Sequence, residues 1–260
     1  MLKVVKIGGK VIDNEAALAS FCDSFAALEA PAILVHGGGA MASRLQKSLG
    51  HEPVMIEGRR VTDIDAIKDV TMVYSGWCNK HICALLQARG CNALGLSGCD
   101  ASVIKARRRA PIALSDGSGT VDYGFVGDVD KSCVDVEFLT KMLKMGITPV
   151  LCAINHDGQG NLLNTNADTV AQSLASALGA ELYCCFEKEG VLADVDDPDS
   201  VIPVLSKEEF LHMRRDGRAS AGMLPKIENC IKALEEGAAS ARIMSYERLS
   251  ELTSGTEIKL

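Results

Sequence analysis

Positive charge and aromatic residues are both scarce in this sequence of 260 residues. Lys and Arg number 27 against 34 Asp and Glu, which gives a net charge of −7, and aromatic residues make up 4%. A protein that binds nucleic acid through a broad basic surface needs the opposite charge balance, so we expect no nucleic-acid partner. A phosphate site in this chain must therefore be local, built from a few lysines and backbone amides.

Long apolar runs and paired metal-binding cysteines are also missing. No stretch approaches the roughly 20 apolar residues that span a membrane, so no membrane association is expected. The ten cysteines include no Cys-x-x-Cys pair, which excludes the usual zinc spacing, and we predict no metal-ligating residues. Several cysteines lie in apolar runs such as 150–153 and 183–186, where a free thiol packs like a small hydrophobic residue. With no secretory signal ahead of the first predicted strand, the expected location is cytoplasmic.

Neither of two common phosphate-binding glycine motifs is present. The glycine clusters Gly8-Gly9 and Gly37-Gly38-Gly39 fit neither G-x-x-x-x-G-K-[ST] nor G-x-G-x-x-G, which disfavours a P-loop NTPase and an ordinary dinucleotide site. Each cluster follows a strand-like run, at 2–7 and 33–35. Glycines there let the backbone approach an anion at the start of the next helix. A tight strand-to-helix turn without a ligand explains either cluster alone equally well.

Strand-like and helix-like segments alternate along the chain. This alternation predicts an α/β fold, a three-layer αβα sandwich with an open, mainly parallel sheet. Residues 102–127, with turn residues at 115–119, predict an antiparallel hairpin insertion. No repeat or linker divides the chain, so we expect a single domain, 1–260. The other predicted strands are 93–96, 147–154, 181–186 and 241–244, and the predicted helices are 14–28, 40–49, 63–89 (with a break near 75–76), 134–145, 167–178, 207–215 and 223–236.

Two lysines occupy positions where a positive charge is costly without an anion. Lys6 lies two residues before Gly8 in an otherwise apolar strand, where a buried ammonium group needs a partner. Lys226 follows Pro225 at the predicted start of a helix, where a positive charge opposes the helix dipole. The alternatives are a lysine on an edge strand and a solvated surface lysine, respectively.

Other polar groups point to an anionic substrate. Asn164-Thr165-Asn166-Ala167-Asp168 precedes an apolar helix, which Asn166 or Asp168 can cap. In the functional interpretation the asparagines bind a polar substrate and Asp168 fixes the lysines. Arg60 can hold a carboxylate through two parallel hydrogen bonds. The arginines at 107–109 are expected on the exposed hairpin, and His36 is interpreted as a packing or turn residue.

Five segments together resemble the amino acid kinase family, in the family's order and over nearly the whole chain. Within it, the chain is most similar to enzymes that phosphorylate the side-chain carboxylate of N-acetyl-L-glutamate in arginine biosynthesis. The resemblance implies ATP as phosphoryl donor, Mg²⁺ held mainly by the nucleotide phosphates, an amino-acid lobe at about 1–170 and a nucleotide lobe at about 171–260. The segments are Val5-Lys6-Ile7-Gly8-Gly9, His36-Gly37-Gly38-Gly39, Gly58-Arg59-Arg60-Val61-Thr62-Asp63, Asn164-Thr165-Asn166-Ala167-Asp168 and Gly222-Met223-Leu224-Pro225-Lys226.

The resemblance also implies roles for individual residues. Lys6 and Lys226 would contact the transferring phosphoryl group while Asp168 orients both. The residues expected to bind the acylated glutamate are Gly38, Gly39, Arg60, Asn164 and Asn166. The residues expected to bind the nucleotide are Gly8, Gly9, Glu187, Lys188, Gly190, Val191, Leu192 and Met223.

Three departures from the family pattern affect these expectations. The segment Phe186-Glu187-Lys188-Glu189-Gly190 replaces a Thr/Ser-Asp-Val segment, so the resemblance defines the adenine contacts less well than the roles of the lysines. The chain begins at its first strand, without the N-terminal helix of hexameric, arginine-inhibited relatives, so we expect a homodimer insensitive to arginine. Arg59 stands where relatives commonly have Leu. It is either a surface residue or a second cation that favours N-succinyl-L-glutamate.

Two broader alternatives stay open. Carbamate, aspartate, glutamate 5- and uridylate kinases share the glycine turns but not the whole set of motifs. A non-catalytic sensor of an amino acid or nucleotide would use the same scaffold. The presence of Lys6, Lys226 and Asp168 together favours catalysis.

Overall fold

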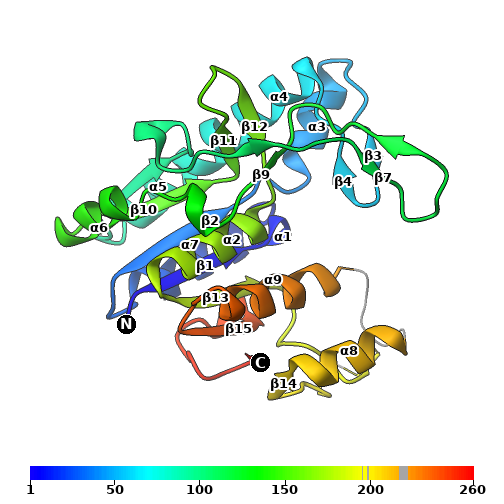
Figure 1. Ribbon diagram of the computed structural model, residues 1–260. Coiled ribbons are helices and arrows are strands. Elements are labelled where there is room, and N and C mark those ends of the chain that lie inside the picture. Colours follow the sequence, from blue (N-terminus) through cyan, green and yellow to red (C-terminus); the bar gives the residue numbers. More distant parts are fainter. Residues whose placement is uncertain (195, 198, 217–221) are drawn as a thin grey trace.

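An eight-stranded sheet forms the centre of the computed structural model, which describes residues 1–194, 196–197, 199–216 and 222–260 (Figure 1). The strand order is β14-β16-β15-β13-β1-β2-β10-β5. Neighbouring strands are parallel except β15 and β16, so the prediction of a mainly parallel sheet is confirmed. The strands are β1 (Lys3–Ile7), β2 (Ala32–His36), β5 (Ala93–Leu96), β10 (Thr148–Cys152), β13 (Glu181–Phe186), β14 (Val204–Ser206), β15 (Ser240–Ser245) and β16 (Thr256–Lys259).

Helices cover both faces of this sheet, because alternate strand residues point to opposite layers. From β1, Val4 packs in one apolar cluster and Val5 and Ile7 in the other. The first layer contains α6 (Val136–Lys144), α7 (Ala167–Leu178), α8 (Lys207–Arg215) and α9 (Leu224–Glu235). The second contains α1 (Gly9–Ile12), α2 (Glu15–Ala26), α3 (Met41–Ser48), α4 (Ile64–Thr71) and α5 (Asn79–Gln87). The predicted three-layer sandwich is confirmed.

Helix ends follow the local capping chemistry. Asn166 caps α7, and Gly179 ends it with φ of +60°, which glycine adopts readily. Ser206 and Glu209 form a capping box at α8. Both helices have the predicted bounds. The predicted break near 75–76 is a π-helical segment, Met72–Cys78, between α4 and α5, so the backbone winding changes there without ending the helix.

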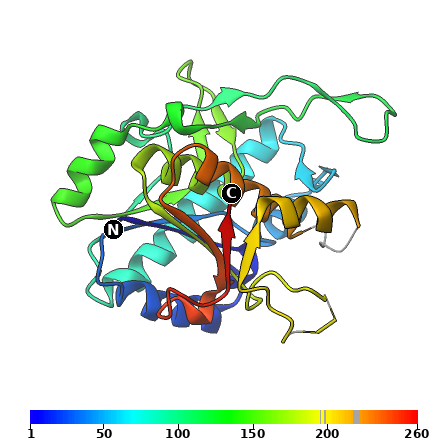
Figure 2. The same ribbon diagram turned by 60° about the horizontal axis from the view of Figure 1, so that its bottom comes forward.

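Short antiparallel hairpins lie at the carboxyl-terminal edge of the sheet. The pairs β6 (Arg107–Arg108) with β9 (Gly127–Asp128) and β7 (Ile112–Ala113) with β8 (Thr120–Val121) confirm the predicted insertion, which extends from the body in Figure 2. Two hairpins were not predicted, β3 (Met55–Ile56) with β4 (Arg59–Arg60), and β11 (Ile154–His156) with β12 (Leu162–Asn164). The predicted strand 147–154 is therefore two strands. Figure 2 also shows the unpredicted β14 and β16 side by side at the far edge of the sheet.

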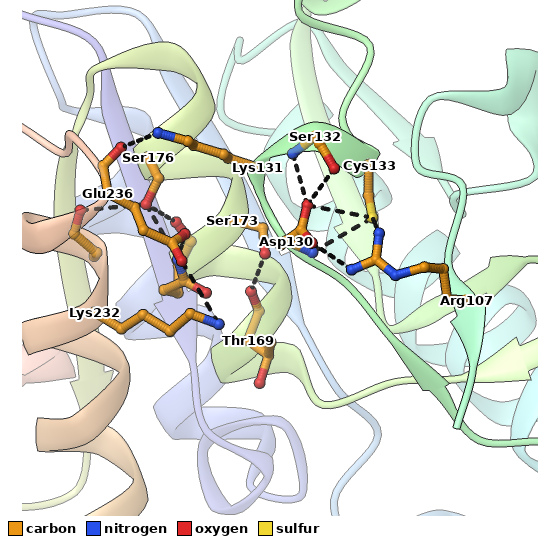
Figure 3. A network of polar contacts seen from close by, with 12 residues as sticks. Arg107, Asp130, Lys131, Ser132, Cys133, Thr169, Ser173, Ser176, Lys232 and Glu236 are labelled. Atoms are coloured by element: carbon orange, nitrogen blue, oxygen red, sulfur yellow. Dashed lines mark hydrogen bonds and ion pairs between the residues drawn. The ribbon is translucent and has the colours of Figure 1, made fainter. Parts of the chain in front are cut away.

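Polar contacts fix α9 against α7 and against the short segment Lys131–Cys133, as Figure 3 shows. The Nζ of Lys131 donates to the carbonyl of Glu236, at 2.9 Å, and Gln172 Nε2 donates to the Glu236 carboxylate, at 2.8 Å. Ser176 Oγ donates to the Ala233 carbonyl, at 3.2 Å. These contacts at the carboxyl-terminal end of α9 hold two helices whose amino-terminal turns carry predicted catalytic residues.

The cysteines agree with one further expectation. All ten cysteines are free thiols, and Cys152, Cys184 and Cys185 are buried, as expected for small apolar groups. Within the part of the chain that the structure describes, no helix has the length and apolarity that crossing a membrane requires.

Candidate active site

One carboxylate holds two lysines near the middle of the sheet. Lys6 points from β1 toward α7, where its Nζ lies 2.7 Å from Oδ1 of Asp168. Lys226, in the first turn of α9, places its Nζ 3.4 Å from Oδ2 of the same group. The edge-strand interpretation of Lys6 is wrong, because β1 pairs with β13 on one side and β2 on the other. Lys6 is 6% exposed, and its charge is balanced inside the protein.

The electrostatics of the Lys6–Asp168 pair favour the ionised form of both groups. Burial, the largest single contribution, would lower the pKa of Lys6, but the charge of Asp168, its hydrogen bond and smaller contributions together outweigh burial and raise that pKa above its ordinary value. For Asp168, burial would raise the pKa, whereas the charges of Lys6 and then Lys226 lower it overall. Both members of the Lys6–Asp168 pair are therefore ionised at neutral pH.

Two cavities meet at this cluster. The larger has a volume of about 670 Å³ and the smaller about 370 Å³. Gly9 lines both, while the bonded pair Asp168 and Lys226 lies with one residue in each. A ligand in one cavity and a ligand in the other would therefore approach each other beside the lysines.

Backbone forms the wall between the cavities because the two glycine turns pack against each other. A Cβ on Gly9 would lie 2.4 Å from the Cα of Gly39, and one on Gly38 would lie 2.0 Å from the Tyr74 ring. Gly39 also has φ of +55°. Asp13 Oδ2 accepts a hydrogen bond from the amide of Ala40, at 2.8 Å, and so supports the second turn. These contacts require glycine and leave the backbone facing the cavities.

His36, the last residue of β2, supports the glycine turn Gly37-Gly38-Gly39 that follows it. Its Nδ1 lies 2.7 Å from the Gly37 carbonyl, and its Nε2 lies 3.0 Å from Asn79 Nδ2, which also donates to the Val150 carbonyl. Since an amide nitrogen only donates, Nε2 accepts and the proton is on Nδ1, which donates to Gly37. Burial lowers the pKa of His36 to about 4, so the ring is neutral. The interpretation of His36 as a turn residue agrees with these contacts.

Three polar side chains predicted for the acyl substrate line the larger cavity. Arg60 donates to Ser43 Oγ, at 2.7 Å, and to the side-chain oxygen of Gln46. Asn164 Nδ2 donates to Thr62 Oγ1, at 3.1 Å. Asn166 Oδ1 accepts from the amide of Asp168, at 2.7 Å, which confirms the capping interpretation and leaves its amide nitrogen for a ligand.

Known proteins of one family resemble this chain over most of its length. A model of the amino acid kinase family matches residues 1–245. The chain belongs to the amino acid kinase family. It is 46% identical to an acetylglutamate kinase of Bacteroides thetaiotaomicron, over 99% of this chain and 98% of that one, and 45% identical to one of Cytophaga hutchinsonii, with the same coverage.

A solved structure shows the same fold at lower identity. N-acetylglutamate synthase from Neisseria gonorrhoeae, in complex with coenzyme A and N-acetyl-glutamate, has a TM-score of 0.81 to this chain at 21% identity. The match covers 100% of this chain and 59% of that protein. The resemblance to the amino acid kinase family that the sequence indicated is thus confirmed.

The residues predicted for the nucleotide divide into two groups in this family member. The smaller cavity is lined by Gly8, Gly9, Glu187, Lys188 and Met223. Gly190, Val191 and Leu192 lie beyond it. The Val191 amide donates to Thr256 Oγ1, at 2.8 Å, and Leu192 bridges to Val201. These three residues shape the loop behind the cavity, and a direct nucleotide contact by them stays a prediction.

Among the described residues, three basic ones that the sequence did not single out line the cavities, namely Lys10, Arg109 and Lys232. Lys10 borders the smaller cavity, and its position directly after Gly8-Gly9 was a usable signal. Arg109 borders the larger one, where it pairs with Asp128 and lies 5.9 Å from the centre of the Tyr123 ring. Its neighbours at 107 and 108 are exposed, as expected. No sequence feature separates Arg109 from them.

Proposed function

We propose that this protein transfers the γ-phosphoryl group of ATP to the side-chain carboxylate of N-acetyl-L-glutamate, forming N-acetyl-L-glutamyl 5-phosphate in arginine biosynthesis. The observation that carries this proposal is the Lys6–Asp168–Lys226 cluster at the junction of two cavities. Identity of 45–46% over nearly full length to proteins named acetylglutamate kinase supports the acceptor.

The chemistry needs charge stabilisation more than acid–base catalysis. A glutamate γ-carboxylate, with an ordinary pKa of about 4.3, is ionised at neutral pH and attacks without a general base. The obstacle is repulsion between this anion and the phosphate it attacks. Lys6 and Lys226 offset that repulsion, and Asp168 holds both ammonium groups in place before the substrates bind.

The described residues are compatible with a magnesium ion that binds together with the nucleotide and is held by its phosphates. Across the described ranges, no three His, Cys, Asp or Glu residues converge in a way that could hold a metal ion. Asp168 is already shared by two lysines. Mg²⁺ would therefore be held mainly by the ATP phosphates, where it supplies further positive charge.

In the larger cavity, Arg60 is placed to hold the α-carboxylate of the acceptor, because its guanidinium is oriented by Ser43 and Gln46. Asn164 and the turn at Gly38-Gly39 supply amide groups for the remaining polar atoms. The lobes divide accordingly, with residues 1–170 mainly around the acceptor and 171–260 mainly around ATP.

A second acceptor follows from the number of cations in the larger cavity. Arg59 is exposed and lines this cavity together with Arg60, and it adds a second guanidinium beyond the one that an α-carboxylate needs, whereas Arg109 is paired with Asp128. A dicarboxylic acyl group, as in N-succinyl-L-glutamate, would use the extra guanidinium. The test compares kcat/KM for the two acylglutamates in the wild type and in Arg59→Leu, with exposed Arg108→Leu as control. A strong acetyl preference that Arg59→Leu leaves unchanged would refute this role.

We further propose a cytoplasmic homodimer. The ten free thiols suit a reducing compartment. Met72 and Trp77 are more than half exposed on one helical segment, which offers an apolar surface for a second copy. Sedimentation velocity with and without L-arginine should give an unchanged dimer, and an arginine-responsive hexamer would contradict the proposal.

The function is tested by measuring ADP release with a panel of acylated and free glutamates, with hydroxylamine to trap the acyl phosphate. We expect turnover with N-acylglutamate and none with free glutamate. Turnover with free glutamate or carbamate would assign a different kinase of this family. Binding of nucleotide and acylglutamate without turnover would identify a sensor.

A further inference from the structure

Lys10 stands outside the Lys6–Asp168–Lys226 cluster but borders the same cavity. It follows Gly9 in α1 and lines the smaller cavity with Lys6 and Lys226. Its side chain is 78% exposed, and its Nζ lies 2.5 Å from Oε1 of Glu187. Lys10 is thus an exposed cation at the mouth of the smaller cavity, and its ammonium group is held by Glu187.

The Lys10–Glu187 pair joins the two sides of that mouth. Lys10 comes from the turn after β1, and Glu187 directly follows β13, the parallel neighbour of β1. Partial burial would raise the pKa of Glu187, but the hydrogen bond from Lys10 and the charges of Lys10 and Lys226 lower it overall. The Glu187 carboxylate is therefore ionised at neutral pH. Because an exposed ion pair contributes little to stability, Lys10 can exchange this partner for a stronger anion at small cost.

The charge balance of the cleft indicates what that anion is. Among the residues that the structure describes, four lysines line the smaller cavity (6, 10, 188 and 226), against Glu187 in its lining and Asp168 at its edge. Asp168 is paired with both Lys6 and Lys226. The lysines that can still change partner are therefore those at the mouth of the smaller cavity. A polyphosphate chain complements this arrangement, whereas a neutral adenosine group does not.

We propose that Lys10 is a third phosphate-binding lysine. In the nucleotide-free protein Lys10 is paired with Glu187, and when ATP binds it gives up this partner and contacts the β- and γ-phosphates. This inference rests on the proposed use of ATP in the smaller cavity. It gives the segment after β13 a role in phosphate recognition, in addition to the nucleotide contacts expected from its sequence.

Calorimetric titration with Mg-ATP and with AMP tests the assignment, since only ATP carries the phosphates concerned. Lys10→Ala should weaken Mg-ATP binding about tenfold or more, with AMP affinity within about twofold of wild type. Lys10→Arg, which keeps the charge, should restore Mg-ATP binding to within about threefold. Lys68→Ala is the matched control, because Lys68 is an exposed lysine paired with Asp65 at 3.0 Å outside both cavities, and it should bind both nucleotides like the wild type.

Glu187→Gln tests the other half of the pair. Removing this carboxylate frees Lys10 and reduces repulsion of the phosphates, so Mg-ATP should bind about two- to tenfold more tightly. Wild-type Mg-ATP affinity in Lys10→Ala, or equal weakening of AMP, would overturn the phosphate-binding role. Weaker Mg-ATP binding in Glu187→Gln would overturn the partner role.

These outcomes are separable from failure of the proposed function. If the Lys10 pattern holds but the wild type releases no ADP with N-acylglutamate, the acceptor assignment fails and the phosphate role stands. If wild type turns over and Lys10→Ala binds Mg-ATP normally, the phosphate role alone fails. Absence of Mg-ATP binding by the wild type would overturn both.

Discussion

Lys6 and Asp168 form a buried ion pair at 2.7 Å, between a central strand and the first turn of a helix. Lys226 shares the carboxylate, so Asp168 reduces the repulsion between the two lysines. Removing one partner of a buried pair leaves an uncompensated charge, which is more costly than the pair itself is favourable. The site and the stability of the protein therefore depend on the same carboxylate.

We expect Asp168→Asn to lower the free energy of unfolding by about 3–5 kcal/mol, because two lysines lose their counter-charge. Lys6→Met, which removes the buried ammonium and leaves Asp168 paired with Lys226, should cost less. Both should abolish most turnover. Urea unfolding and ADP release measure the two effects, and a Lys6→Met variant less stable than Asp168→Asn would contradict the argument.

Lys226→Ala should lower kcat by about 10²- to 10³-fold, the usual cost of losing one charge-stabilising contact in a transition state. Its effect on KM for ATP should be much smaller, since the contact strengthens as the phosphoryl group transfers. Steady-state ADP release over a range of ATP concentrations separates the two constants. Unchanged turnover would remove Lys226 from the proposed role.

The pKa of His36, lowered to about 4 from an ordinary value of 6.5, predicts acid sensitivity. The unfolded chain takes up the proton below about 6.5 and the folded protein only near 4, so stability falls as pH decreases through this interval. The loss from His36 amounts to about 3 kcal/mol at most. Urea unfolding at several pH values should show this slope in the wild type.

The matched variants for this slope are His36→Asn and His81→Asn. Replacing His36 removes the titrating ring behind the glycine turn and should flatten the dependence between pH 6.5 and 4. Replacing His81, on α5, should leave it unchanged. Equal slopes in His36→Asn and the wild type would show that another group dominates.

Much of the fold was predictable because local and global signals agree. The bounds of α7 follow from an Asn cap and a terminal glycine, and those of α8 from a capping box, all visible in sequence. The strands β14 and β16 were missed because each is three or four residues long and is stabilised by pairing at the sheet edge. Such strands depend on distant partners more than on their own pattern.

The candidate site was predictable where a residue type is unusual for its position in the sequence. Lys6 in an apolar strand and Lys226 at a helix start each required an anion, and Asp168 is that anion for both. Lys10 could have been found from its position directly after Gly8-Gly9. Arg109 is an ordinary charged residue in sequence, and only the packing of the hairpins shows that it borders a cavity.

Arg60→Lys should raise KM for the acylglutamate by about 10- to 100-fold, because an ammonium group cannot form the two parallel hydrogen bonds of a guanidinium with a carboxylate. Mg-ATP affinity should stay close to wild type, since Arg60 lines the larger cavity and not the smaller one. Gln46→Leu removes one of the two groups that orient Arg60 and should have an intermediate effect, with Ser43 still in place. Acceptor KM values equal to wild type in Arg60→Lys would place the α-carboxylate elsewhere, whereas a parallel loss of Mg-ATP binding would indicate a general structural defect.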